Sequence, residues 1–347
     1  MTRRLLPILA ALAAVAGLGA CGGGDDGGGG SGAAAADAEK LVVYSGRGEK
    51  LVGPLFADFE KRTGVELQVR YGDSAELAAT IAEEGDASPA DVFFSQDAGA
   101  LGAVQAEGLL SPLPAATLDR VQDRFRDPSG HWVGTSGRAR VVAYSAERLK
   151  PAQLPDSVFD FTDPRWKGRI GFAPPNASFQ AFLSAMRIDV GDARTKKWLA
   201  GIKRNEPTLL ENNIQTEEAI AAGEIDVGFV NHYYVHELRA ERPDFPVENH
   251  FLGRGDPGAL VNVAGAGILK SAEHADAARR LVDFMLSRTG QEYFARKTFE
   301  YPLIDGVAAP KGTRALADVH GPDIALGALG DKLPSTLQML SEAGFAS

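Results

Sequence analysis

Two adjacent tyrosines, Tyr233 and Tyr234, are the residues whose type and spacing point most directly to chemistry. They follow an apolar stretch, residues 225–230, that is typical of a buried strand. Adjacent tyrosines often serve only packing, but loops at strand ends of an α/β sheet are where ligands bind. Two phenolates are hard oxygen donors, which a small trivalent cation such as Fe(III) prefers. Because a free phenol loses its proton only near pH 10, a strongly polarising cation is needed to hold both as phenolates.

Other catalytic or metal-binding patterns are weaker. His232 and His236 are four residues apart and precede Glu237, so they could share a helical face and bind zinc in a secreted enzyme. The flanking sequence, however, is typical of a strand end. The stretch 46–51 has leucine where a dinucleotide-binding loop needs its third glycine, and the sequence has neither a Walker motif nor HExxH.

Composition restricts the class of protein. The chain has 347 residues, of which 44% are hydrophobic and 24% charged, which is typical of a globular protein long enough for two lobes. A formal net charge of −10 and the absence of a basic run exclude a nucleic-acid binder. The single cysteine excludes an internal disulfide, a CxxC redox pair and a zinc site built on several thiolates.

The N-terminal residues predict export and anchoring. Arg3 and Arg4 precede an apolar stretch, residues 5–18, and Leu-Gly-Ala leads directly into Cys21. This arrangement resembles a bacterial lipobox, so we expect a signal peptide over residues 1–20 and a lipidated Cys21. The alternative is an ordinary signal peptide with an incidental cysteine. Residues 21–39 are mostly Gly and Ala and predict a flexible tether. The folded part is therefore expected on the outer face of the cytoplasmic membrane, at the cell surface or in the periplasm.

Strand and helix patterns alternate after this tether. Residues 41–44, 65–71, 90–94, 140–144, 169–172, 225–230 and 260–268 are predicted strands. Helical spacing of apolar residues is seen from Leu51 to Phe59, with Gly64 as a stop, and around Leu77 and Ile81. Further helices are predicted near 196–203, 217–222 and 275–286. This alternation indicates α/β lobes whose loops at the strand ends carry the function.

A series of short motifs identifies a family resemblance. They are Val-Tyr-Ser-Gly-Arg at 43–47, Ser-Pro-Ala-Asp-Val-Phe at 88–93, Ser-Gly-Arg-Ala-Arg-Val-Val at 136–142, Pro-Asn-Ala-Ser-Phe at 175–179, Gly-Glu-Ile-Asp at 223–226, Asn-His-Tyr-Tyr at 231–234 and Asp-Pro-Gly-Ala-Leu at 256–260. In this order the chain resembles the ferric-iron-binding substrate-binding proteins of bacterial ABC importers. The resemblance implies an α/β, two-lobed periplasmic-binding-protein fold with two crossing hinge strands. Lobe 1 would comprise residues 40–136 plus 262–309, and lobe 2 residues 137–261 plus 310–347.

The resemblance also implies metal ligands. Tyr233 and Tyr234 match the paired iron ligands of the family. A histidine and a third tyrosine found in some members are here Gly48 and Ala177, and the acidic ligand is here Gln96. Its neighbour Asp97 is the remaining candidate, although it could instead cap the helix that begins at Ala98.

A bound anion would complete the site. Fe(III) with two phenolates keeps one positive charge and open coordination positions, which carbonate or phosphate fills in the family. Arg47 and Arg138 match positions near that anion, and guanidinium forks suit oxyanions. Hydrogen-bonding positions of the family match Asn176, Ser178 and Asn213. Surface salt bridges for the arginines, and helix capping for Asn176 and Ser178, are the alternatives.

The sequence thus predicts a lipid-anchored, monomeric binding protein without catalytic activity. It would capture ferric iron with a synergistic anion and deliver it to an ABC permease and its ATPase subunits. Two rivals remain: a binder of an organic or phosphorylated anion, and a secreted zinc enzyme using His232, His236 and Glu237.

Overall fold

The computed structural model describes residues 39–345. The predicted signal peptide, Cys21 and almost all of the predicted tether lie outside these residues. Within the described range, no helix has both the length and the apolar character needed to cross a membrane.

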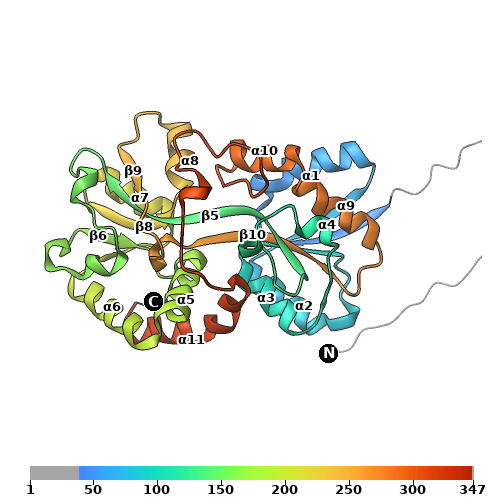
Figure 1. Ribbon diagram of the computed structural model, residues 1–347, viewed down its shortest axis with the longest axis horizontal. Helices are drawn as coiled ribbons and strands as arrows, with labels where there is room; N and C mark the ends of the chain where they lie inside the picture. The colour runs from blue at the N-terminus through green and yellow to red at the C-terminus, as the bar shows by residue number, and fades with distance from the viewer. Residues whose placement is uncertain (1–38, 346–347) are drawn as a thin grey trace, which may run out of the picture. The chain divides into compact units, whose positions relative to one another are not determined.

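The described chain alternates strands and helices, which confirms the predicted α/β class (Figure 1). The strands are β1 (Lys40–Ser45), β2 (Glu66–Tyr71), β3 (Val92–Ser95), β4 (Leu110–Ser111), β5 (Trp132–Ser145), β6 (Ile170–Phe172), β7 (Thr208–Leu209), β8 (Val227–Asn231), β9 (Val247–His250) and β10 (Val261–Leu269). The helices are α1 (Glu49–Thr63), α2 (Ser74–Glu84), α3 (Ala98–Ala106), α4 (Ala115–Leu118), α5 (Ala177–Val190), α6 (Asp192–Arg204), α7 (Asn213–Ala222), α8 (Tyr234–Glu241), α9 (Ala275–Met285), α10 (Arg288–Lys297) and α11 (Leu329–Glu342).

Local sequence accounts for the first of these elements. Helix α1 buries Val52, Leu55, Phe56 and Phe59, which recur at the spacing of one helical face. It ends at Gly64, whose φ of 74° is the left-handed conformation that glycine adopts without steric cost. Strand β2 alternates exposed and half-buried residues, as its alternating sequence predicts.

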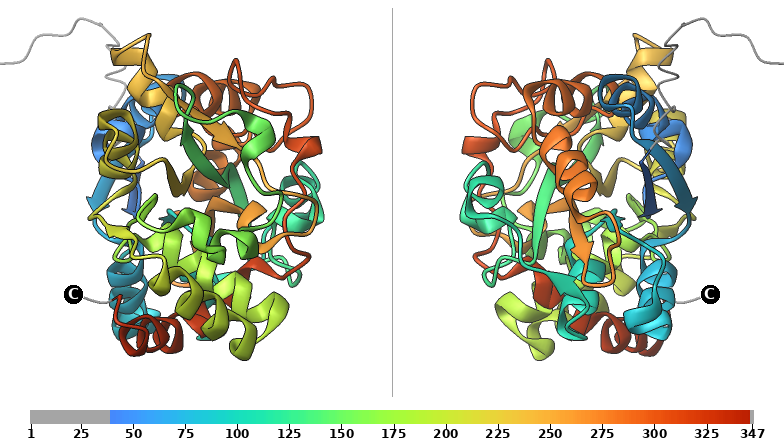
Figure 2. Two further views of the ribbon diagram at one scale, coloured as in Figure 1. Left: turned by 90° about the vertical axis from the view of Figure 1, so that its left-hand side faces the viewer. Right: turned by 90° about the vertical axis from the view of Figure 1, so that its right-hand side faces the viewer.

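One mixed sheet runs through the described chain. Its strand order is β2-β1-β3-β10-β5-β8-β6-β7, with β4 added beside β10 and β9 beside β5. Strands β1, β2 and β3 are mutually parallel, as are β6, β7 and β8, while β5 and β10 are antiparallel to their neighbours. In Figures 1 and 2 helices cover both faces of this sheet, with α1, α9 and α10 above the β1 end and α2 and α3 below it.

Strands β5 and β10 connect the two ends of the sheet. Residues 132–139 of β5 pair with β10, whereas residues 140–145 pair with β8 and β9. All residues of β5 are buried. The sequence predicted a strand only from residue 140, so β5 begins eight residues earlier than expected. The register shifts between Ala264 and Gly265 of β10, where a Cβ on Gly265 would lie 2.7 Å from the carbonyl oxygen of Val133.

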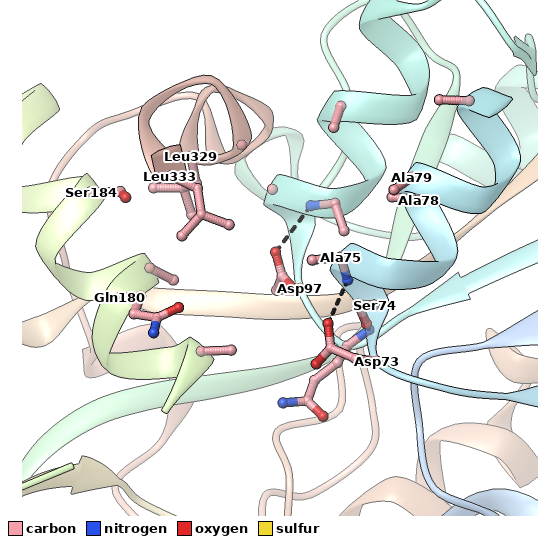
Figure 3. A pocket seen from close by; sticks show the side chains of 18 of the residues that line it. Asp73, Ser74, Ala75, Ala78, Ala79, Asp97, Gln180, Ser184, Leu329 and Leu333 are labelled. Atoms are coloured by element: carbon pink, nitrogen blue, oxygen red, sulfur yellow. Dashed lines mark hydrogen bonds between the residues drawn. The ribbon is translucent and has the colours of Figure 1, made fainter. Parts of the chain in front are cut away.

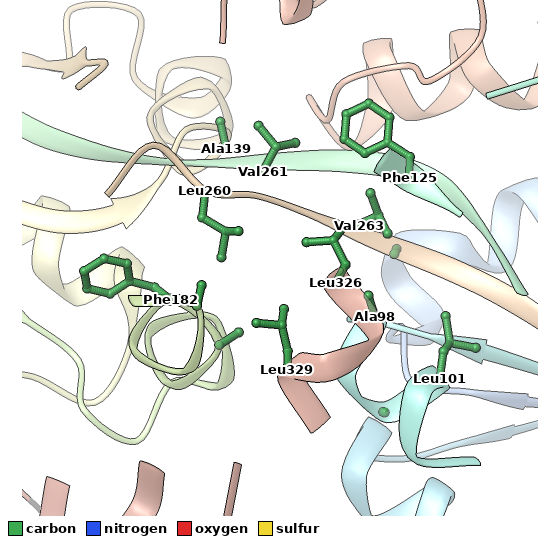
Figure 4. Packing of buried hydrophobic residues seen from close by; sticks show 14 of the residues in the cluster. Ala98, Leu101, Phe125, Ala139, Phe182, Leu260, Val261, Val263, Leu326 and Leu329 are labelled. Carbon is green, nitrogen blue, oxygen red and sulfur yellow. The ribbon is translucent and has the colours of Figure 1, made fainter. Parts of the chain in front are cut away.

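The C-terminal segment packs against both ends of the molecule. Leu326, in a short 3-10 turn (Leu326–Ala328), and Leu329 lie between Phe182 of α5 and Leu101 of α3 (Figure 4). The close approach to α3 requires glycine, because a Cβ on Gly102 would clash with the carbonyl group of Gly327. Arg187 of α5 donates hydrogen bonds to Ser335 and Thr336 of α11. Helix α11 therefore contacts helices from both ends of the sheet.

Candidate metal centre

The tyrosine pair lies where β8 ends and α8 begins. Tyr233 precedes the first helical residue, Tyr234, and their ring centroids are 4.1 Å apart. Tyr233 is buried and Tyr234 is half-buried. Burial, followed by the neighbouring Tyr234, raises the pKa of the Tyr233 phenol well above 10, while the charges of Arg138 and Arg47 act in the opposite direction. Two oxygen donors and two cations therefore share one buried region.

Arg47 and Arg138 meet at one carboxylate that the sequence did not indicate. Arg47 follows β1 and its Nη2 lies 2.9 Å from Oε1 of Glu300. Arg138 projects from β5 with its Nε 3.8 Å from the same oxygen. The other oxygen of Glu300 accepts hydrogen bonds from Ser136 and Thr298. Arginine positions matched to an anion site are therefore buried rather than in surface salt bridges.

Several buried N–H donors of these two arginines and of Arg140 have no hydrogen-bond partner among the described residues. They are Nε of Arg47, Nε and Nη1 of Arg138, and Nη2 of Arg140. The amide oxygen and nitrogen of Asn213, the first residue of α7, are also buried without a partner. Buried polar groups are normally satisfied, so an unsatisfied set of this kind is suited to a polar ligand.

The other hydrogen-bonding candidates have partners. Asn176 caps α5, since its side-chain oxygen accepts a hydrogen bond from the backbone N–H of Ser178. The hydroxyl of Ser178 accepts a hydrogen bond from Asn231, the last residue of β8, and Asn231 in turn accepts one from Arg140. Arg140 is a further site residue that sequence reasoning missed. Burial lowers its pKa to about 9, and Tyr234 and Tyr233 partly offset that effect.

Asp97 is a helix cap in the structure. Its Oδ1 accepts a hydrogen bond from the backbone N–H of Ala100, 3.1 Å away, in the first turn of α3. It lines a cavity of about 380 Å³ between α2, α3, α5 and α11. Figure 3 shows this cavity with Asp97 and Ser74 on one side, Gln180 on the other, and Leu329 and Leu333 of α11 between the two walls. The tyrosine pair is not among its lining residues.

The two histidines of the zinc alternative have other roles. Nδ1 of His232 accepts a hydrogen bond from the backbone N–H of Ala139, and its ring stacks on Tyr301 with centroids 4.4 Å apart. Burial lowers the pKa of His232 to about 3. The sequence predicted the end of a strand around these histidines; β8 ends at Asn231, and His236 lies on the following helix α8. Nε2 of His236 lies 2.7 Å from the Thr313 hydroxyl. Within residues 39–345, no three His, Cys, Asp or Glu side chains gather as a possible metal site.

Glu237 is an acidic side chain one helical turn after the tyrosine pair. It is half-buried on α8. Burial, with a further contribution from the charge of Glu300, raises its pKa to about 7, whereas Arg47 and Lys50 lower it. Sequence reasoning placed Glu237 only in the zinc alternative. Its position three residues after Tyr234 was the available signal.

Comparison with known proteins places this chain in a family. Residues 87–320 match the model of a family described as bacterial extracellular solute-binding protein. The chain belongs to this family. An Fe(3+)-binding periplasmic protein of Serratia marcescens is 34% identical over 307 residues, which cover 88% of this chain and 90% of the relative.

Solved structures agree with this assignment. Iron-bound HitA from Pseudomonas aeruginosa aligns with a TM-score of 0.82 and 32% identity, covering 88% of this chain and 99% of HitA. A Trichodesmium protein (IdiA, FutA) in complex with iron and citrate aligns with a TM-score of 0.78 and 27% identity, covering 88% and 100% of the two chains. The resemblance to ferric-iron-binding proteins and the periplasmic-binding-protein fold are therefore confirmed. Members of the solute-binding family are binding proteins rather than enzymes.

Proposed function

We propose that the protein captures ferric iron outside the cytoplasmic membrane, with Tyr233 and Tyr234 as phenolate ligands. The observation that carries this proposal is the tyrosine pair at the β8–α8 junction, whose buried member Tyr233 lies within the electrostatic reach of Arg47 and Arg138. The positive charges lower the cost of ionising the phenols, and Fe(III) prefers the resulting hard oxygen donors.

A synergistic anion belongs to this proposal. Fe(III) with two phenolates carries a net charge of about +1. Three arginines, Arg47, Arg138 and Arg140, are buried here, and the only carboxylate that pairs with any of them among the described residues is that of Glu300. The excess of positive charge and the unsatisfied guanidinium N–H groups favour an oxyanion such as carbonate, phosphate or citrate.

Binding is coupled to transport in this proposal. Strands β5 and β10 serve as the two hinge strands between lobe 1 (residues 40–136 plus 262–309) and lobe 2 (residues 137–261 plus 310–347). The loaded protein, as a monomer, delivers iron to an ABC permease and its ATPase subunits. Family membership supports an importer of this kind.

Cys21 provides the lipid anchor in this proposal, although it lies outside the described residues. Changing Cys21→Ser should release the protein from membranes in cell fractionation, with iron binding unaltered. Retention of the variant on membranes would argue against lipidation at Cys21.

Metal analysis and an absorption spectrum of the purified protein test iron binding directly. Tyrosinate-to-iron charge transfer gives a visible band, which zinc or a bare anion would not. The variant carrying both Tyr233→Phe and Tyr234→Phe should lose the band and the iron while keeping its fold. Tyr144→Phe, on β5 beside Glu248, is the matched control. Ferric binding by the double variant would overturn the proposal.

A second candidate function is the binding of an organic or phosphorylated anion without metal. The unsatisfied N–H groups of Arg47 and Arg138 are the observation that favours it. Titration of metal-free protein with phosphate and citrate separates the two functions. Tight anion binding without iron, together with no charge-transfer band when iron is added, would favour this second function.

A further inference from the structure

Two tyrosines alone leave a ferric ion with open coordination positions, which a carboxylate of the protein could fill. Asp97 accepts a backbone hydrogen bond as the cap of α3, and Gln96 is an uncharged amide. Glu300 pairs with Arg47 and accepts hydrogen bonds from two hydroxyl groups. Among the described residues, two further buried or half-buried carboxylates on the neighbouring helices α7 and α8 have no side-chain partner: Glu217, which is completely buried on α7, and Glu237, which is half-buried on α8. Of these two, Glu237 is the one within a helical turn of the tyrosine pair.

Helix geometry directs Glu237 towards the phenols. The backbone N–H of Glu237 bonds to the carbonyl of Tyr233 at 3.1 Å, so the chain is helical from the tyrosine pair onward. Residues three apart lie on the same face of a helix, about 5–6 Å apart at Cβ. Side chains on a helix tilt towards its N-terminus, so a residue at this spacing is expected to extend towards the turn that carries Tyr234.

Glu237 and Tyr233 share two charged neighbours. Glu300 and Arg47 act electrostatically on both Glu237 and Tyr233, and Lys50 acts on Glu237 from the first turn of α1. Arg47 and Lys50 flank Gly48, where an added Cβ would meet no atom within 4 Å.

The carboxylate of Glu237 also lacks a partner within the protein, which leaves it available to bind a metal ion. It is half-buried, yet neither of its oxygens forms a hydrogen bond or an ion pair with any residue from 39 to 345. Glu248 of β9, by contrast, forms an ion pair with Arg239, which lies on α8 as Glu237 does. A partly buried carboxylate without a partner costs folding free energy, a pattern that is common at ligand sites.

We propose that Glu237 supplies a third protein ligand to the ferric ion, a carboxylate oxygen carried by the same short helix as Tyr234. This proposal rests on iron binding by the tyrosine pair. A carboxylate is a hard oxygen donor and neutralises the positive charge that two phenolates leave on Fe(III). Tyr233, Tyr234 and Glu237 then form a ligand set from one five-residue segment, and the anion occupies the side nearest Arg138.

The test compares Glu237→Gln, Glu237→Asp and the control Glu241→Gln, which lies one turn later on α8. Iron affinity is measured by competition with citrate, and the loaded proteins are compared by visible absorption and by electron paramagnetic resonance. We expect Glu237→Gln to lower iron affinity at least about 100-fold, more than the loss of an outer-shell partner usually does. Its charge-transfer band should shift but persist, because both phenolates remain.

Glu237→Asp separates a ligand from a distant charge. The aspartate keeps the charge but is shorter by one methylene, so a ligand role predicts a loss of affinity and an altered resonance spectrum. Wild-type affinity and spectra in the Asp variant, or equal losses in the Glu237→Gln and Glu241→Gln variants, would overturn the proposal. If the wild-type protein itself shows no charge-transfer band with iron, iron binding by the tyrosines fails first and the ligand proposal fails with it. A wild-type band that Glu237→Gln leaves unchanged overturns only the role of Glu237.

Discussion

The carboxylate of Glu300 lies 2.9 Å from Arg47 and 3.8 Å from Arg138, and all three side chains are buried. Arg47 follows β1, Arg138 lies on β5, and Glu300 follows α10, so the cluster joins distant parts of the sequence. One carboxylate thus pairs with two guanidinium groups and neutralises only one of their charges. The cluster therefore holds the arginines in place while leaving a positive charge for an anion.

Removing this carboxylate should destabilise the fold. Glu300→Gln leaves Arg47 and Arg138 buried without a counter-charge, which typically costs about 3–5 kcal/mol. Urea unfolding of the metal-free protein measures the change. Glu292→Gln is the control, because its ion pairs with Arg288 and Arg296 are exposed and should contribute less than about 1 kcal/mol. Equal losses of unfolding free energy in both variants would mean that the buried ion pairs of Glu300 contribute no more to stability than the exposed ion pairs of Glu292.

Substitution of Asp97 distinguishes capping from metal binding. Asparagine also caps helices, so Asp97→Asn should keep both the stability and the iron affinity of the wild type. Asp97→Ala should lose about 1 kcal/mol of stability, measured by thermal unfolding, with iron binding retained. A loss of iron affinity in Asp97→Asn, measured without added anion, would instead assign Asp97 to the metal.

Much of the fold follows from local patterns. Apolar spacing gives α1, alternation gives β2, and Gly64 gives the helix end. The early part of β5 could not be predicted because Ser136 and Arg138 are polar in sequence and are buried only by distant segments. The pattern of apolar residues cannot show that a polar residue is buried, because that burial depends on segments far away in the sequence.

The candidate site was predictable to a similar extent. The tyrosine pair stands out because its chemistry is local to two adjacent residues. Glu300 and Arg140 do not, because each acquires its role from contacts with segments far away in the chain. Glu237 is intermediate, since its helical spacing from Tyr234 is visible in the sequence but its lack of a partner is not.

The pH dependence of stability should report on Glu237. Its pKa is raised from 4.5 to about 7 by burial and by Glu300 and Glu241, against the effects of Arg47 and Lys50. The folded state thus binds this proton more tightly than the unfolded state does. The stability that results is complete below pH 4.5 and is lost as the pH rises through 7.

Glu237→Gln mimics the protonated form at every pH. Metal-free Glu237→Gln should therefore match the wild type near pH 4.5 and exceed its stability by about 1–3 kcal/mol at pH 8. Urea unfolding at a series of pH values measures this difference. A difference that stays constant with pH would contradict the raised pKa of Glu237.

Arg138 should couple anion binding to iron binding. Its Nε and Nη1 have no hydrogen-bond partner among the residues that the structure describes, and a guanidinium fork binds oxyanions in a bidentate manner. In the wild type, phosphate added to carbonate-free buffer should raise iron affinity by a factor within the usual range for coupled sites, about 5–150. Arg138→Lys keeps the charge but lacks the fork, so this factor should fall towards one. Arg148→Lys, at a partly exposed ion pair with Asp226, is the control. An unchanged phosphate effect in Arg138→Lys would show that the anion is held elsewhere, because loss of the fork is the one relevant difference between the two proteins.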